Sequence, residues 1–207
     1  YDYQGRPAVQ VMPSPINEYV LDYYPGLNKN NLGEPFSKAD FDEDGTNNCT
    51  MMVPGEMSTQ NGASKYYSPS NPQQNAANGM IPNAQGYPYS QVEYMPDNTG
   101  RIRRQGNVGF DFQLGRGHEI SYMYDQPGQS ELDRLFGSEV GYYDHYQRIM
   151  QIDQNGQASY VYKDLKGNII ASALVGLNPD GLSQIQGYSE GSSVITEVIG
   201  TTEKQDN

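Results

Sequence analysis

Residues 146–174 read YQRIMQIDQNGQASYVYKDLKGNIIASAL, and this stretch decides the fold. Two Asp-x-x-Gly turns, Asp153–Gly156 and Asp164–Gly167, separate runs that are rich in β-branched and aromatic residues. This spacing predicts a meander of three antiparallel strands joined by tight turns. The strands are expected at 146–152, 157–162 and 168–174.

The same unit of tyrosine, aspartate and turn glycine recurs along the chain. Its clearest copies are Tyr1-Asp2-Tyr3-Gln4-Gly5-Arg6 and Tyr162-Lys163-Asp164-Leu165-Lys166-Gly167-Asn168. The expected fold class is therefore mainly β, built from antiparallel hairpins. Period-two patterns predict further strands at 8–12, 89–94, 101–104 and 119–124. One short helix is expected near 131–136, with Ser130 as its N-cap and Gly137 at its end.

Composition divides the chain into four segments. Segment 28–86 is rich in Asn, Gly and Pro and poor in apolar residues, which predicts a long irregular insertion. The other three segments are a β segment at 1–27, a β segment with the short helix at 87–186, and a C-terminal strand or tail at 187–207.

Charge and cysteine content exclude several classes of function. The 207 residues contain 13 Lys and Arg against 25 Asp and Glu, a net charge of −12, which argues against binding to nucleic acid phosphates. The longest apolar run, Ile169–Leu177, is shorter than the roughly 20 residues of a membrane helix. The single Cys49 excludes an internal disulfide framework, and with no histidine near it in sequence it is read as a bystander thiol.

The Tyr-Asp-x-x-Gly-Arg unit at Tyr1–Arg6 resembles the YD repeats of the Rhs family. Longer runs are similar to the large secreted Rhs-like proteins of Bacteroidota. These runs are Tyr66–Pro69, Glu93–Gly106, Gly115–Glu119 and Glu131–Gly137.

The resemblance implies that the chain is an internal stretch of a much longer polypeptide, secreted or held at the outer cell surface. Members of the family wind such hairpins into a hollow β-shell around a C-terminal toxin or effector region. The implied role is structural and non-enzymatic, and the implied partners are the remainder of the polypeptide, the enclosed effector or the secretion machinery. Within the repeats, cross-strand packing is expected for Tyr3, Tyr94, Tyr124, Tyr160 and Tyr162, and positive φ at Gly5, Gly100, Gly156 and Gly167.

One motif has the spacing of a calcium loop. Asp40, Asp42 and Asp44 stand at alternate positions before Gly45, an arrangement that can wrap oxygen ligands around a hard cation. Met51 occupies the twelfth position, where an EF-hand needs glutamate, so a solvated acidic loop is the competing interpretation. The alternative function is accordingly a calcium-stabilised surface adhesin or carbohydrate-binding module, with tyrosines stacking on sugars.

The remaining candidate motifs favour structural roles. His118 and His145 do not complete a zinc pattern, and Arg101, Arg103 and Arg104 are expected to pair with acids. The Asn178–Leu182 turn resembles the motif at which Rhs cores cleave themselves, but asparagine replaces the catalytic-type aspartate. No catalytic residue is predicted.

Overall fold

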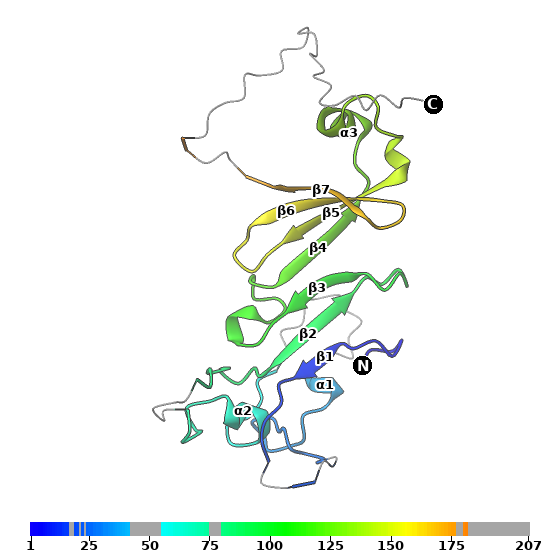
Figure 1. Ribbon diagram of the computed structural model, residues 1–207. Coiled ribbons are helices and arrows are strands. Elements are labelled where there is room, and N and C mark those ends of the chain that lie inside the picture. The colour runs from blue at the N-terminus through cyan, green and yellow to red at the C-terminus, as the bar shows by residue number, and fades with distance from the viewer. Residues whose placement is uncertain are drawn as a thin grey trace, which may run out of the picture. The chain divides into compact units, whose positions relative to one another are not determined.

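The computed structural model describes residues 1–16, 19–20, 22, 24–41, 55–74, 80–176 and 180–181 (Figure 1). The chain divides into two units, Tyr1–Val175 and Gly176–Asn207, and every element below belongs to the first. The mainly β fold class is confirmed. Seven strands form one antiparallel sheet in the order β1 to β7, so each strand pairs with its neighbours along the chain.

The sheet is a meander interrupted by longer connections. Its strands are β1 Val9–Val11, β2 Tyr89–Tyr94, β3 Ile102–Gly106, β4 Ile120–Asp125, β5 Tyr146–Ile152, β6 Ala158–Asp164 and β7 Ile169–Leu174. The helices are α1 Lys38–Phe41, α2 Gly62–Tyr66 and α3 Gln129–Phe136, with single 3-10 turns at Phe110–Phe112 and Tyr143–His145. The predicted strands of the final third therefore match β5, β6 and β7 closely.

The turns that join β5, β6 and β7 share one hydrogen-bond pattern. Oδ1 of Asp153 accepts the backbone N–H groups of Asn155 and Gln157, each at 2.9 Å. The N–H of Gly156 donates to the Asp153 carbonyl at 3.0 Å, and Gly156 adopts a φ of 80°. Asp164 makes the same bonds to Lys166, Gly167 and Asn168. An aspartate at the first position and a glycine at the fourth are thus what the backbone requires.

Two further turns carry the same pattern. Oδ1 of Asp2 accepts the N–H groups of Gln4 and Arg6 at 2.9 and 2.8 Å. Oδ1 of Asn30 accepts the N–H groups of Leu32 and Glu34, both at 3.0 Å. The Asn30 copy lies in the segment that sequence analysis assigned to an irregular insertion. It was missed because asparagine replaces the aspartate and no tyrosine precedes it.

The two buried clusters are formed by the insertion together with the start of β2, and neither includes a residue of the final meander. Met57, Tyr87 and Tyr89 form one buried cluster, against which Val9 and Phe36 pack. Ala63, Tyr67 and Ala84 form a second buried cluster. The small side chains of Ala63 and Ala84 permit close approach of backbone segments. The described part of the insertion, with α1 and α2, is therefore packed and contains helices that the sequence did not predict.

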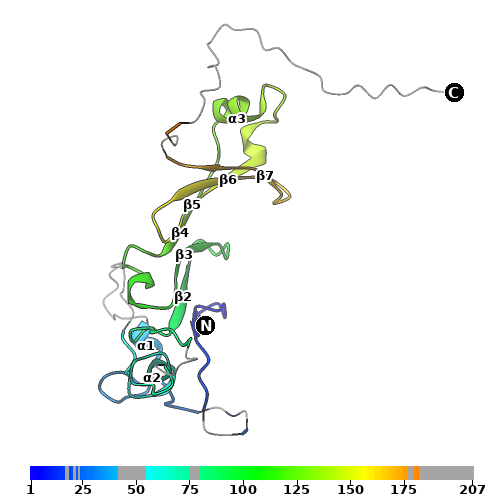
Figure 2. The same ribbon diagram turned by 60° about the vertical axis from the view of Figure 1, so that its left-hand side comes forward.

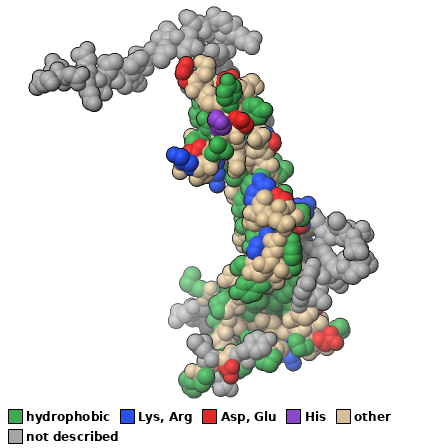
Figure 3. Space-filling view, turned by 90° about the vertical axis from the view of Figure 1, so that its right-hand side faces the viewer, with side chains coloured by type: hydrophobic (Ala, Val, Ile, Leu, Met, Phe, Trp, Pro, Cys, Tyr) green, Lys and Arg blue, Asp and Glu red, His purple; other side chains and the backbone are tan. Residues whose placement is uncertain are grey.

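The strands β4 to β7 form a single layer (Figures 1 and 2). Tyr162 is the only side chain in these four strands that is buried. Met123, Ile169 and Leu174 of these strands are exposed. Figure 3 shows hydrophobic side chains at the surface among polar and charged ones. This part of the sheet has little core of its own.

Helix α3 begins two residues before the predicted start. Gly128 is its N-cap, and the Glu131 carboxylate accepts the Gly128 N–H at 3.2 Å. The assignment of Ser130 as the N-cap was therefore wrong, because Glu131 closes the first turn from the third helical position. The predicted end is confirmed, since the N–H of Gly137 donates to the Asp133 carbonyl at 2.8 Å with a φ of 83°.

Candidate functional site

Arginine side chains stack on tyrosine rings between paired strands. The Arg6 guanidinium lies 4.1 Å from the centre of the Tyr94 ring, and that of Arg101 lies 4.8 Å from the Tyr124 ring. Arg148 repeats the arrangement over Tyr160 at 5.0 Å. The positive guanidinium is attracted to the electron-rich face of the tyrosine ring. Each stack therefore adds a favourable contact between neighbouring parts of the sheet.

The arginine of each of the first two stacks is oriented by the aspartate four residues before it. Nε of Arg6 donates to Asp2 at 2.6 Å, and Nη2 of Arg101 donates to Asp97 at 2.7 Å. Hydrogen bonds from Thr99 and Arg101 lower the pKa of Asp97 to about 2, so this carboxylate stays ionised. The Asp-x-x-Gly-Arg pattern in the sequence thus specifies a turn, and its aspartate also orients the arginine side chain over a tyrosine ring.

The tyrosines of these stacks also bind the backbone of a preceding strand or the segment leading into it. The Tyr94 hydroxyl donates to the carbonyl of Pro7 at 2.9 Å, and the Tyr124 hydroxyl donates to that of Ile102 at 2.9 Å. Tyr3 differs, because 82% of it is exposed and its hydroxyl contacts only side chains, Asn98 at 3.5 Å and Gln4 at 3.2 Å. Cross-strand packing is therefore present at Tyr94 and Tyr124, whereas Tyr3 lies on the surface.

A polar hub joins α3 to three strands. Nη1 of Arg148 lies 2.9 Å from both oxygens of Glu131, and its Nη2 donates to Asp125 at 2.7 Å. The Tyr162 hydroxyl donates to Glu131 as well. Burial and the hydrogen bond to Glu131 raise the pKa of Tyr162 to about 12. Burial alone would raise the pKa of Glu131, but the Tyr162 and Arg148 hydrogen bonds outweigh it and lower that pKa.

Gln113 connects the loop after β3 to strand β2 through side-chain hydrogen bonds. Its side chain is fully buried, and its Nε2 donates to the carbonyls of Tyr89, Asn107 and Gly109 at 3.2, 2.6 and 3.3 Å. Neither Gln113 nor the hub of Glu131 and Arg148 was predicted. Their partners are distant in sequence, and no local pattern marks them.

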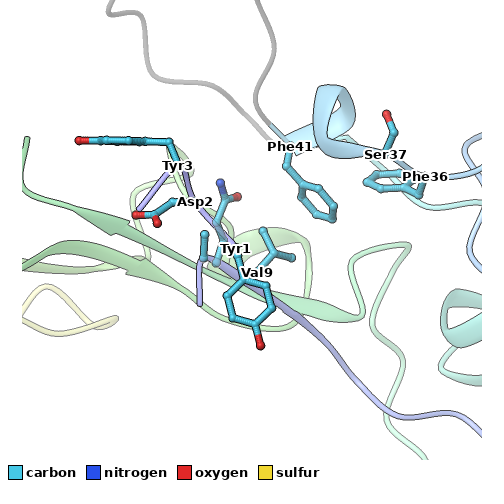
Figure 4. Close-up of a pocket in the computed structure, with 9 residues that line it drawn as sticks. Tyr1, Asp2, Tyr3, Val9, Phe36, Ser37 and Phe41 are labelled. Atoms are coloured by element: carbon cyan, nitrogen blue, oxygen red, sulfur yellow. The ribbon is translucent and has the colours of Figure 1, made fainter. Parts of the chain in front are cut away.

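A pocket of about 480 Å³ lies beside the N-terminal turn and α1 (Figure 4). Phe36 and Phe41 lie together on one side, with ring centres 4.9 Å apart, and Val9 and Tyr1 lie across from them. Asp2 is paired with Arg6 and the Ser37 hydroxyl donates to Asp40, which leaves a mostly apolar wall. This pocket can accept an apolar or aromatic surface.

The structure places one of the three predicted calcium ligands. Oδ2 of Asp40 accepts both the N–H and the hydroxyl of Ser37, at 2.7 and 2.9 Å, at the start of α1. Asp42 and Asp44 lie outside the described residues, as do Cys49 and the Asn178–Pro179 pair. Over the described ranges, no three His, Cys, Asp or Glu side chains are grouped to hold a metal ion. The calcium site stays a prediction.

The histidines and the basic cluster make ordinary contacts. His118 Nδ1 lies 2.9 Å from the Gln154 carbonyl, and His145 Nε2 lies 3.7 Å from Asp144. The predicted pairing of the arginines with acids is confirmed by ion pairs to three carboxylates, one of which is the 3.5 Å pair of Arg104 with Glu119. Arg103 and Arg104 both bind Glu93, and Arg101 binds Asp97.

In comparisons with known proteins, no family model, curated protein or solved structure matches this chain. In the part of the chain that the structure describes, no helix is long and apolar enough to cross a bilayer. The resemblance to the Rhs family therefore stays a prediction. The repeated turns and stacks are the features from which a function can be argued.

Proposed function

We propose that this chain is a non-enzymatic structural segment of a large secreted or outer-surface protein of the Rhs/YD-repeat type. Its sheet forms part of a β-shell wall that encloses or presents a C-terminal effector or toxin region. The observation that carries the proposal is the repeated hairpin unit, in which an Asp-x-x-Gly turn and an arginine–tyrosine stack recur along one sequential sheet.

The burial pattern supports a wall more than a self-contained domain. In β4 to β7 only Tyr162 is buried, and Met123, Ile169 and Leu174 are exposed. A single layer of hairpins cannot bury its own faces, so its stability depends on neighbouring units. Such a wall would gain its missing contacts from the remainder of the same polypeptide.

The Asp2 turn supports continuation of the wall beyond β1. Its N–H donates to the Arg6 carbonyl at 2.9 Å, as Asp153 and Asp164 donate to their partners four residues on. Those two turns join paired antiparallel strands. An extended segment leading into the Asp2 turn would therefore run antiparallel to β1 along its outer edge.

The two histidines lie on the surface and make ordinary polar contacts. His118 binds a backbone carbonyl and His145 faces Asp144, and both side chains are exposed. Within the described ranges, neither histidine contacts a hydroxyl that it could activate. A role in presenting another region needs no such group.

The test is electron microscopy of the full-length polypeptide from which this chain comes. A hollow shell with density inside it is the expected result, and labelling of the Leu165 turn would place this segment in its wall. A compact or fibrous particle without a cavity would overturn the proposal. The purified chain alone serves as the control, because it is too short to close a shell.

The apolar pocket favours a second candidate, a calcium-stabilised adhesin or carbohydrate-binding module. The Tyr1 side chain is 87% exposed at the pocket, and aromatic faces of this kind stack on sugar rings. Calorimetric titration with calcium and then with neutral oligosaccharides tests it. No heat with either ligand, in the intact chain, removes this candidate.

A further inference from the structure

Within the part of the chain that the structure describes, the outer edge of β7 lacks the features that protect sheet edges. Residues 169–175 read IIASALV and contain no charge and no proline. Ile169 is 65% exposed and Leu174 78% exposed. Across the described ranges, no strand pairs with this edge. Natural edge strands are usually blunted by charge, proline or a covering element, so an apolar, uncharged edge marks a surface for strand pairing.

The backbone of β7 shows which residues would pair. The Val175 N–H donates to the Ala158 carbonyl at 2.9 Å, which directs Val175 toward β6. Alternate residues of an antiparallel pair point their N–H and C=O groups the same way. The register shift in this pair falls between Tyr162 and Lys163, so the alternation is regular from Ala171 onward. Ser172 and Leu174 therefore present their backbone groups at the outer edge.

The sequence of β7 is a chemical palindrome centred on Ser172. When the strand is reversed about this residue, Ser172 faces Ser172, Ala171 faces Ala173, Ile170 faces Leu174 and Ile169 faces Val175. Each pair matches in size and polarity. The centre falls on a residue whose backbone groups point outward, so the two copies of Ser172 can form a hydrogen-bonded pair at a two-fold axis.

We infer that β7 pairs with β7 of a second copy of this chain, antiparallel and about a two-fold axis at Ser172. The two seven-stranded sheets then continue as one. This goes beyond the proposed wall, whose other contacts come from the same polypeptide, because it assigns the β7 edge to a second copy. The palindrome favours a second copy over an unrelated strand, since pairing with an unrelated strand imposes no such symmetry. The chain's net charge of −12 opposes association, but no charge lies within the seven residues that pair.

The first experiment measures association of the purified chain by sedimentation equilibrium. The wild type should show a monomer–dimer equilibrium, and S172K should weaken it by about tenfold or more, because two like charges then face each other at the axis. S130K is the matched control. It makes the same change at an exposed position of α3, and it should associate like the wild type. Equal far-UV circular dichroism of the monomers would show that the variants are folded.

A cross-link tests the geometry itself. In a C49S background, S172C should form a disulfide-linked dimer under mild oxidation, whereas S130C should not. A wild-type chain that stays monomeric at about 100 µM would overturn the inference. Equal association of S172K, or a dimer that S172C fails to cross-link, would also overturn it. Any of these results leaves the microscopy of the full-length polypeptide as a separate test of the wall.

Discussion

Nη1 of Arg148 in β5 lies 2.9 Å from both carboxylate oxygens of Glu131 in α3. This contact joins the helix to the sheet, and the Leu132 side chain of the same helix is fully buried. The side chains of Arg148 and Glu131 are 22% and 20% exposed, so the pair is partly shielded from water. For that reason the pair contributes more to the stability of the fold than a fully exposed ion pair does.

Replacing Glu131 by glutamine should destabilise the chain. The E131Q change removes the charge that holds Arg148 and Tyr162, and the free energy of unfolding should fall by about 1–3 kcal/mol. Urea unfolding followed by circular dichroism measures this. E139Q is the control, because Glu139 is exposed and the change in charge is the same. Equal midpoints for the two variants would show that the hub does not stabilise the fold.

Acid should weaken the fold through the same carboxylates. The pKa values of Asp125 and Glu131 lie below their ordinary values of 3.8 and 4.5 in the folded chain. The folded state therefore binds fewer protons than the unfolded state, so stability is full above about pH 5 and falls as the pH drops below about 4. Melting temperatures across this range test the prediction, and E131Q should show a shallower fall. Parallel curves for both proteins would contradict it.

Substitutions at Gly156 should separate backbone strain from packing. A Cβ built there meets no described heavy atom within 4 Å, so the cost comes from the φ of 80° alone. G156V should lower the free energy of unfolding by about 2 kcal/mol, and G156N by under about 1 kcal/mol, because asparagine tolerates this conformation. Chemical denaturation of both variants provides the comparison. Valine at no greater cost than asparagine would refute the turn assignment.

Gln113 should be a strong stability determinant despite being polar. In Q113A the carbonyls of Tyr89, Asn107 and Gly109 lose their shared donor, and the free energy of unfolding should fall by about 1–3 kcal/mol. Q126A, at an exposed glutamine, should change stability by less than about 0.5 kcal/mol. Hydrogen exchange should also show faster exchange of the 107–113 loop in Q113A. Unchanged exchange there would mean that the glutamine does not hold the loop.

The final meander was predicted because its signals are local. Strand β5 was predicted at 146–152, and the structure places it at Tyr146–Ile152. Each Asp-x-x-Gly turn satisfies its own backbone groups within five residues, so Asp153 and Asp164 set the register without outside help. The end of α3 at Gly137 was predicted for the same reason. Its start was predicted wrongly, because Ser130 was taken as the N-cap, whereas the structure has Gly128 at that position and Glu131 accepts its N–H.

The core and the hub could not be predicted from local pattern. Ala63, Ser64 and Ala84 are small residues in a polar, turn-rich segment, which is typical of a loop. They are buried because α2 and the segment before β2 fold back onto one another. Glu131, Arg148 and Tyr162 are likewise separated by 31 positions from first to last. Only long-range packing brings such residues together.

The sequence by itself determined the mainly β class, the hairpin turns and the arginine that follows a turn by a fixed spacing. These depend on hydrogen bonds within a few residues and on the period-two pattern of strands. Tertiary structure alone decided where the core lies, that Glu131 joins α3 to the sheet, and that no strand among the described residues pairs with the outer edge of β7. Those features depend on which distant segments exclude water from one another, and no local pattern carries that information.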